Sequence, residues 1–170
     1  MSAPVPLPTV TYSGAIISGC ARYRYSLIRR WADGALLVFV MLNPSKADAN
    51  ADDPTVRKCM GFAHRLGHSG IRIVNLFAWR ATDPKELTQV DDPIGPDNDR
   101  YIHEALESAD RVVCAWGNGG ALYDRGALVT RMIVEAGVQP YALKINGTGH
   151  PAHPLYQPYS RELVPFSATR

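Results

Sequence analysis

Apolar runs alternate with segments of helical periodicity over most of this chain. The apolar runs are residues 35–42, 71–77, 111–116 and 140–145. A run of this kind, without regular polar alternation, is typical of a strand buried on both faces. Strands that alternate with helices form parallel sheets, because each helix returns the chain to the end of the sheet where the previous strand began. We therefore predict an α/β fold, a three-layer α/β/α domain with a four-stranded parallel sheet.

Three helices are predicted between these strands. The first begins at Pro54 with Asp53 as its N-cap and ends at Gly67, because Asp is a preferred cap and Pro is tolerated in the first turn. The second follows Gly95-Pro96. The third ends at Gly137, and its expected inward-facing residues are Leu128, Val129, Met132 and Ile133.

The N-terminal part of the chain differs from the alternating part. Residues 1–11 are rich in proline, and we expect a flexible tail there, followed by a single domain over residues 12–170. Residues 12–31 alternate enough to predict one or two antiparallel strands. Asp33-Gly34 is a turn signal between strand-like segments, and we expect it to close an N-terminal antiparallel hairpin.

Composition restricts the classes of protein to which the chain can belong. With 46% hydrophobic and 20% charged residues it is typical of a folded globular domain, and no apolar run reaches the roughly 18–20 residues of a membrane helix. The three cysteines are widely spaced and odd in number, which argues against a disulfide framework or a metal cluster. We expect a cytoplasmic protein without metal or other cofactor and without an obligate protein partner. The formal net charge of +2 permits nucleic-acid binding without requiring it.

Polar or glycine-rich segments follow each of the predicted parallel strands. Ligands bind beyond the carboxyl ends of the strands in open parallel sheets, so these segments should border one cleft. The candidate site residues, in chain order, are Asn43, Pro44, Ser45, Lys46, Asp53, Asn75, Trp79, Arg80, Trp116, Gly117, Asn118, His150 and His153.

Purely structural interpretations exist for these residues as well. Asp53 can serve only as a helix cap, and Asn43 can bond the backbone of its own loop. The tryptophans can pack in the core. His150 and His153 have a spacing that suggests zinc, but no third ligand is in register and the neighbouring prolines exclude a helix there.

Several motifs, taken in order, resemble the family known as DUF1643, a domain of unknown function. They are Met41–Asp48 with Asp53–Thr55 and Arg57, Asn75–Ala78 with Arg80–Thr82, Gly95-Pro96 with Asn98-Asp99, Ala115–Gly117, and Gly149–Leu155. That family is in turn remotely similar to the uracil-DNA glycosylase superfamily, in its mismatch-specific branch. Leu42-Asn43-Pro44-Ser45 is similar to the first motif of that superfamily, and Gly149-His150-Pro151-Ala152 to the second. The resemblance implies a uracil-DNA glycosylase-like fold.

Hydrolysis of an N-glycosidic bond is the chemistry that this resemblance implies. Asn43 would position the attacking water, and Asp53 would supply negative charge beneath the sugar. His150 or His153 would hydrogen-bond the departing base as charge builds on it. The second His-Pro pair leaves open which histidine acts. The target base would leave the DNA stack to enter the cleft.

The resemblance also implies roles for the remaining candidates. Trp79 or Trp116 would stack on the base, whereas Lys46, Arg80 and the N–H groups near Gly117 would hold phosphates. We therefore expect a DNA glycosylase that removes a modified, bulky phage-type pyrimidine from double- or single-stranded DNA, in DNA repair or antiphage defence. The alternatives are an N-glycosidase of free nucleosides or nucleotides and a non-catalytic nucleic-acid-binding module. A basic group could form a DNA-facing patch or a solvated face, and it comprises Arg22, Arg24, Arg29 and Arg30.

Overall fold

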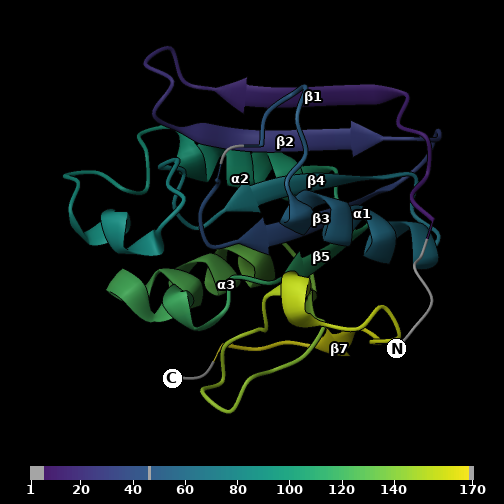
Figure 1. The fold of residues 1–170 in the computed structure, drawn as a ribbon. Coiled ribbons are helices and arrows are strands. Elements are labelled where there is room, and N and C mark those ends of the chain that lie inside the picture. The colour runs from purple at the N-terminus through teal and green to yellow at the C-terminus, as the bar shows by residue number, and fades with distance from the viewer. Residues whose placement is uncertain (1–5, 46, 169–170) are drawn as a thin grey trace.

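A computed structural model describes residues 6–45 and 47–168 of the chain. Within these residues the core of the molecule is a seven-stranded mixed sheet with the spatial order β1-β2-β4-β3-β5-β6-β7 (Figure 1). The strands are β1 (Tyr12–Ile17), β2 (Arg24–Arg30), β3 (Leu36–Met41), β4 (Gly70–Asn75), β5 (Arg111–Cys114), β6 (Pro140–Ala142) and β7 (Val164–Pro165). The helices are α1 (Pro54–Arg65), α2 (Asn98–Glu107) and α3 (Arg125–Glu135), with short 3₁₀ turns η1 (Pro84–Thr88), η2 (Asn118–Asp124) and η3 (Pro154–Tyr156).

The predicted α/β class is confirmed, but the predicted four-stranded sheet is too small. Strands β4, β3, β5 and β6 are parallel to one another. Antiparallel strands extend both edges of this group, β2 and β1 beside β4 and the short β7 beside β6. The central strands are therefore shielded on both sides, and the sheet combines parallel and antiparallel pairing.

Alternate residues of the central strands face opposite layers of helices. On β3, Leu37 and Phe39 pack in the same cluster as Val56 and Met60 of α1. Val38 and Val40, on the other face of β3, pack with buried residues of α2 and α3. Because both faces are covered, the strand reads as an unbroken apolar run. Asp53 caps α1 as predicted, accepting a 2.8 Å hydrogen bond from the Val56 N–H.

The Asp33-Gly34 turn does not close a hairpin, and this prediction was wrong. Strand β4 lies between β2 and β3, so the segments on either side of the turn never pair with each other. The N-terminal hairpin consists of β1 and β2 instead. Gly70 allows this insertion, because it pairs with Arg30 on one side and with Leu36 on the other. A Cβ at Gly70 would lie 2.4 Å from the Arg29 carbonyl oxygen.

Other sequence predictions differ from the structure at the ends of the elements. Strand β6 stops at Ala142 rather than Ile145, after which residues 143–153 form an irregular loop with one isolated bridge. Leu128 of α3 is exposed, because the buried side of the helix is centred on Val129 and Ile133. Of the predicted tail, residues 1–5 lie outside the described residues, and residues 6–11 form no helix or strand. No helix in the described ranges has the length and hydrophobicity needed to cross a membrane.

Candidate functional site

A cavity of about 340 Å³ lies beyond the carboxyl ends of β3 and β4. Its size is near the lower end of the about 300–1,000 Å³ typical of small-molecule sites. The segments that border it come from β2, the loop after β3, the first turn of α1, β4 and the segment after it, the segment after β5 and the loop that carries η3. The polar residues among them are Arg24, Asn43, Ser45, Asp53, Thr55, Asn75, Thr82 and His153.

The side-chain amide nitrogen of Asn43 is hydrogen-bonded, whereas its carbonyl oxygen has no partner among the described residues. Its Nδ2 donates to the carbonyl oxygens of Ala81 at 2.9 Å and Pro44 at 3.2 Å. Both amide hydrogens therefore have partners on the backbone, and Oδ1 remains to accept a hydrogen bond. An acceptor in this position can orient a water molecule, although an amide cannot remove its proton at neutral pH.

Asp53 is held in place by both of its carboxylate oxygens. Oδ1 caps α1 through the Val56 N–H, and Oδ2 accepts a hydrogen bond from the Ser45 hydroxyl. The Asp53 side chain therefore both caps α1 and borders the cavity, so its role as a helix cap is compatible with a role in the site. The carboxylate therefore lies at the N-terminus of α1, beside the cavity.

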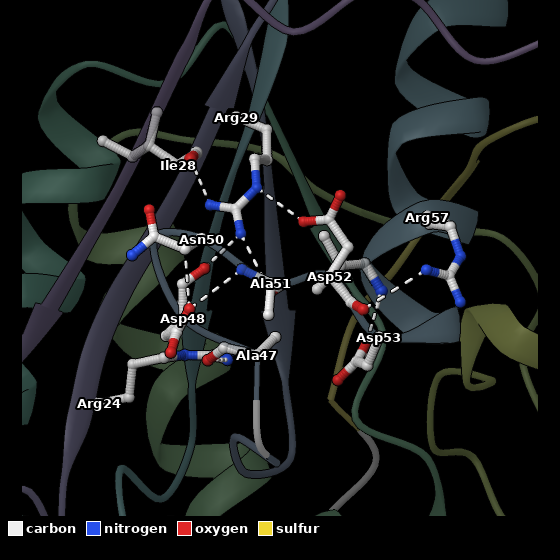
Figure 2. Close-up of polar contacts among 11 residues, drawn as sticks. Arg24, Ile28, Arg29, Ala47, Asp48, Asn50, Ala51, Asp52, Asp53 and Arg57 are labelled. Carbon is white, nitrogen blue, oxygen red and sulfur yellow. Dashed lines mark hydrogen bonds and ion pairs between the residues drawn. The ribbon is translucent and has the colours of Figure 1, made fainter.

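The loop between β3 and α1 is fastened to β2 by a buried arginine (Figure 2). Arg29 donates to the carboxylate of Asp52 at 2.7 Å and to the carbonyl oxygens of Ile28, Asp48 and Ala51. Asp48 in turn accepts hydrogen bonds from the N–H groups of Asn50 and Ala51. These bonds fix the loop that connects Asn43 and Ser45 to Asp53.

His153 borders the cavity with a defined tautomer. Its Nδ1 accepts a 3.2 Å hydrogen bond from the Leu155 N–H at the start of η3, so the proton of the neutral ring lies on Nε2. Burial lowers the pKa of His153 below its ordinary value, and the negative charge of Asp53 opposes this shift. The imidazole is consequently neutral at pH 7 and offers an N–H donor.

Asn75 has no hydrogen-bond partner for either side-chain atom among the described residues. The side chain is almost completely buried, and it borders the cavity. A buried amide without partners is unfavourable by about 1–3 kcal/mol, and native structures rarely contain one. Asn75 thus keeps two N–H donors and one carbonyl acceptor without partners at the wall of the cavity.

The comparisons with known proteins give one family. The model of a family described as "Protein of unknown function (DUF1643)" matches residues 24–155. The chain belongs to the DUF1643 family. The matched range contains every residue that borders the cavity except Tyr156. No curated protein and no solved structure matched the chain.

Seven of the predicted site residues border the cavity of this DUF1643 chain, namely Asn43, Pro44, Ser45, Asp53, Asn75, Trp116 and His153. Trp116 packs edge-on against Phe166 and is 2% exposed, so little of its indole is open to the cavity. Lys46 lies outside the described residues. Five other predicted residues do not border the cavity, namely Trp79, Arg80, Gly117, Asn118 and His150.

These five residues have structural partners or lie at a second cavity. Trp79 packs edge-on against Tyr23, and Arg80 donates to the Ala21 carbonyl oxygen. The Gly117 N–H donates to Pro151, and Asn118 Oδ1 accepts from Asn146 and Thr148. His150 borders a smaller cavity with Trp116 and Phe166. Of the two histidines, the DUF1643 fold therefore brings only His153 to the larger cavity.

Four polar or aromatic residues of the cavity were not among the predicted site residues, namely Arg24, Thr55, Thr82 and Tyr156. Tyr156, which is 80% exposed, stands at the rim 6.0 Å from the His153 ring. Its position shortly after the His153-Pro154 pair was the available signal. Arg24 and Arg29 were assigned to a surface patch, but they are 3% and 2% exposed. Alternation along β2 could not show this, because β4 covers one edge of the strand and the loop after β3 covers its side chains.

The donor set of the site is not that of a metal centre. In the part of the chain that the structure describes, no group of three or more His, Cys, Asp or Glu side chains is placed to hold a metal ion. The cavity instead combines amide, hydroxyl, carboxylate, imidazole and guanidinium groups. This set is suited to a polar organic ligand with several hydrogen-bonding atoms.

Proposed function

We propose that this DUF1643 chain is a DNA N-glycosylase with a uracil-DNA glycosylase-like fold, which hydrolyses the N-glycosidic bond of a modified pyrimidine. The observation that carries this proposal is the buried, unpartnered amide of Asn75 at the wall of the cavity. A pyrimidine presents adjacent donor and acceptor atoms along one edge, and a side-chain amide pairs with such an edge through two hydrogen bonds. Asn75 would therefore read the base.

The other polar groups support the steps of the hydrolysis. The Nε2–H of His153 can donate to a carbonyl oxygen of the base as the bond to the sugar breaks and negative charge develops there. Oδ1 of Asn43 can orient the water that attacks the anomeric carbon, and the carboxylate of Asp53 can stabilise positive charge on the sugar. The departing base then takes up a proton, and the sugar keeps the hydroxyl as an abasic site.

Access to a base in DNA requires that the base leave the helical stack. Tyr156 at the cavity rim offers an exposed aromatic ring on which a neighbouring base can stack. A cavity of about 340 Å³ accommodates one flipped nucleoside rather than several nucleotides. This arrangement supports a base in DNA as the substrate, and the polar loop around Ser45 supports a modified base.

The test is incubation of the purified protein with duplex and single-stranded DNA carrying uracil, mismatched or hypermodified pyrimidines, followed by alkaline cleavage of abasic sites. We expect cleavage at one modified base and a loss of about 10²-fold or more in Asn75→Ala, since two hydrogen bonds to the base disappear. Gln89→Ala, an exposed amide outside the cavity, is the control and should retain full activity.

The same assay includes the corresponding free nucleosides and nucleotides. If base is released from free nucleosides or nucleotides but from no DNA, the substrate is a free nucleoside or nucleotide rather than DNA. Absence of abasic product from every DNA in the panel, with folded protein, would refute the proposed function.

A further inference from the structure

Three arginines of the described chain are almost completely buried, and two of them are paired with a carboxylate. Arg29 donates to one carboxylate and three carbonyl oxygens. Arg125 donates to the Leu76 carbonyl oxygen at 2.8 Å and forms an ion pair with Asp99. Each of these guanidinium groups is neutralised by a carboxylate, so their roles are explained by the fold itself.

Arg24 is different. Its Nη1 donates to the Ala47 carbonyl oxygen at 2.8 Å, but Nε has no partner among the described residues, and no carboxylate there forms an ion pair with it. Figure 2 shows Arg24 and Arg29 reaching the same loop, and several dashed contacts join the guanidinium of Arg29 to its neighbours. Arg24 also borders the cavity, whereas Arg29 does not.

The charge of Arg24 persists at neutral pH. Burial lowers its pKa to about 10, and the charge of Asp53 opposes this shift. Asp53 forms no ion pair with the guanidinium, and its two oxygens bind the Val56 N–H and the Ser45 hydroxyl. A buried cation without a direct counter-ion is unfavourable in an empty site and favourable once an anion occupies that site.

We propose that Arg24 binds an oxyanion of the ligand in the cavity, either a carboxylate on the base or a phosphate of the target nucleotide. The guanidinium suits this role because its planar N–H groups match the geometry of both anions. The proposal rests on the proposed function only for the pyrimidine part of the ligand, which Asn75 would bind. It assigns to the same cavity a preference for acidic over neutral ligands.

Matched pairs of ligands test this preference by titration calorimetry. The first pair is 5-carboxyuracil and uracil, and the second is 2′-deoxyuridine 5′-monophosphate and 2′-deoxyuridine. We expect the anionic member of one pair to bind about 10- to 100-fold more tightly than its neutral partner. The pair that shows the difference identifies whether the anion lies on the base or on the nucleotide.

Variants establish whether Arg24 is responsible. Arg24→Gln should remove the preference, and Arg24→Lys should retain part of it because the charge remains. Arg72→Gln is the matched control, since Arg72 is a partly buried arginine of β4 that binds Ser26 and Glu104 and does not border the cavity. Each variant is first checked for its cooperative unfolding transition, and Arg24→Lys carries the test if Arg24→Gln is unfolded.

Three outcomes overturn the proposal: equal affinity within both pairs, a preference that survives in Arg24→Gln, or no binding of any of the four compounds. The abasic-site assay is scored separately. An acidic preference without abasic product would contradict the glycosylase and leave the role of Arg24 intact. Abasic product without an acidic preference would contradict the role of Arg24 and leave the proposed glycosylase activity intact.

Discussion

At the residue scale, the chemistry of the site depends on which nitrogen of His153 carries the proton. The Leu155 N–H binds Nδ1, so the neutral ring carries its proton on Nε2. A protonated ring would lose this contact, because both of its nitrogens would then be donors. Burial favours the neutral form for the same ring. One backbone hydrogen bond and the burial of the ring therefore make Nε2–H of His153 a hydrogen-bond donor at neutral pH.

The first prediction concerns the pH dependence of stability. Because the pKa of His153 is lower in the folded state than its ordinary value of about 6.5, the unfolded chain binds more protons below that pH. This contribution to stability is present above about pH 6.5 and is lost as the pH falls below it. His153→Gln should therefore show a shallower loss of unfolding free energy than the wild type between about pH 6.5 and pH 5, measured by urea denaturation.

The control for this measurement is His103→Gln, at an exposed position on α2. It should keep the wild-type slope. His68 is also buried with a lowered pKa, so the His153 variant should retain part of the slope. Identical slopes in the wild type and His153→Gln would contradict the assignment of a buried neutral ring.

At the element scale, the loop between β3 and α1 is shaped by a neighbouring strand rather than by its own sequence. It carries Asn43 and Ser45 at one end and Asp53 at the other, and Arg29 of β2 binds its middle. The turn formed by Asp48 is local and could be anticipated from sequence. The anchoring by Arg29 could not, because residues 19 to 23 positions apart must first meet across the sheet.

The second prediction tests this anchor. Arg29→Met should lower the free energy of unfolding by about 2–4 kcal/mol, because Asp52 and three carbonyl oxygens lose a charged donor. Arg30→Met is the matched control on the same strand. Arg30 donates to the carbonyl oxygens of Ala32 and Gly34 at the surface, so Arg30→Met should lower the free energy of unfolding by less than about 1 kcal/mol. Equal costs for the two variants in chemical denaturation would show that Arg29 does not hold the loop.

At the scale of the whole molecule, the C-terminal segment completes the sheet and one wall of the site. Strand β7 pairs with β6, and Phe166 directly after it packs edge-on against Trp116, with the ring centroids 5.7 Å apart. Trp116 also borders the cavity. The last part of the chain thus supports a residue of the site that lies 50 positions earlier in the sequence.

The third prediction follows from this support. Phe166→Ala should reduce the free energy of unfolding by about 3–5 kcal/mol, the usual cost of removing a buried phenylalanine. It should also weaken ligand binding, because Trp116 loses its packing partner. Val164→Ala, an exposed change on β7, should alter stability by no more than about 0.5 kcal/mol. Denaturation and calorimetry on both variants measure the two effects, and unchanged stability in Phe166→Ala would contradict the packing role.

Sequence alone determined the features that depend on neighbouring residues. The alternation of apolar runs with helices and the capping of α1 by Asp53 belong here, because periodicity and capping act over one turn or one strand. The convergence of polar residues beyond the parallel strands was also predictable for Asn43, Asp53 and Asn75, since parallel strands share one carboxyl edge.

The tertiary structure decided which distant segments pair and which side chains they enclose. It inserted β4 between β2 and β3, brought His153 rather than His150 to the cavity, and buried Arg24 beside that cavity. These outcomes depend on competition between segments for the same edge of a strand and the same volume in the core. Local periodicity carries no information about that competition. It shows which faces of a segment are buried, but not which other segments bury them.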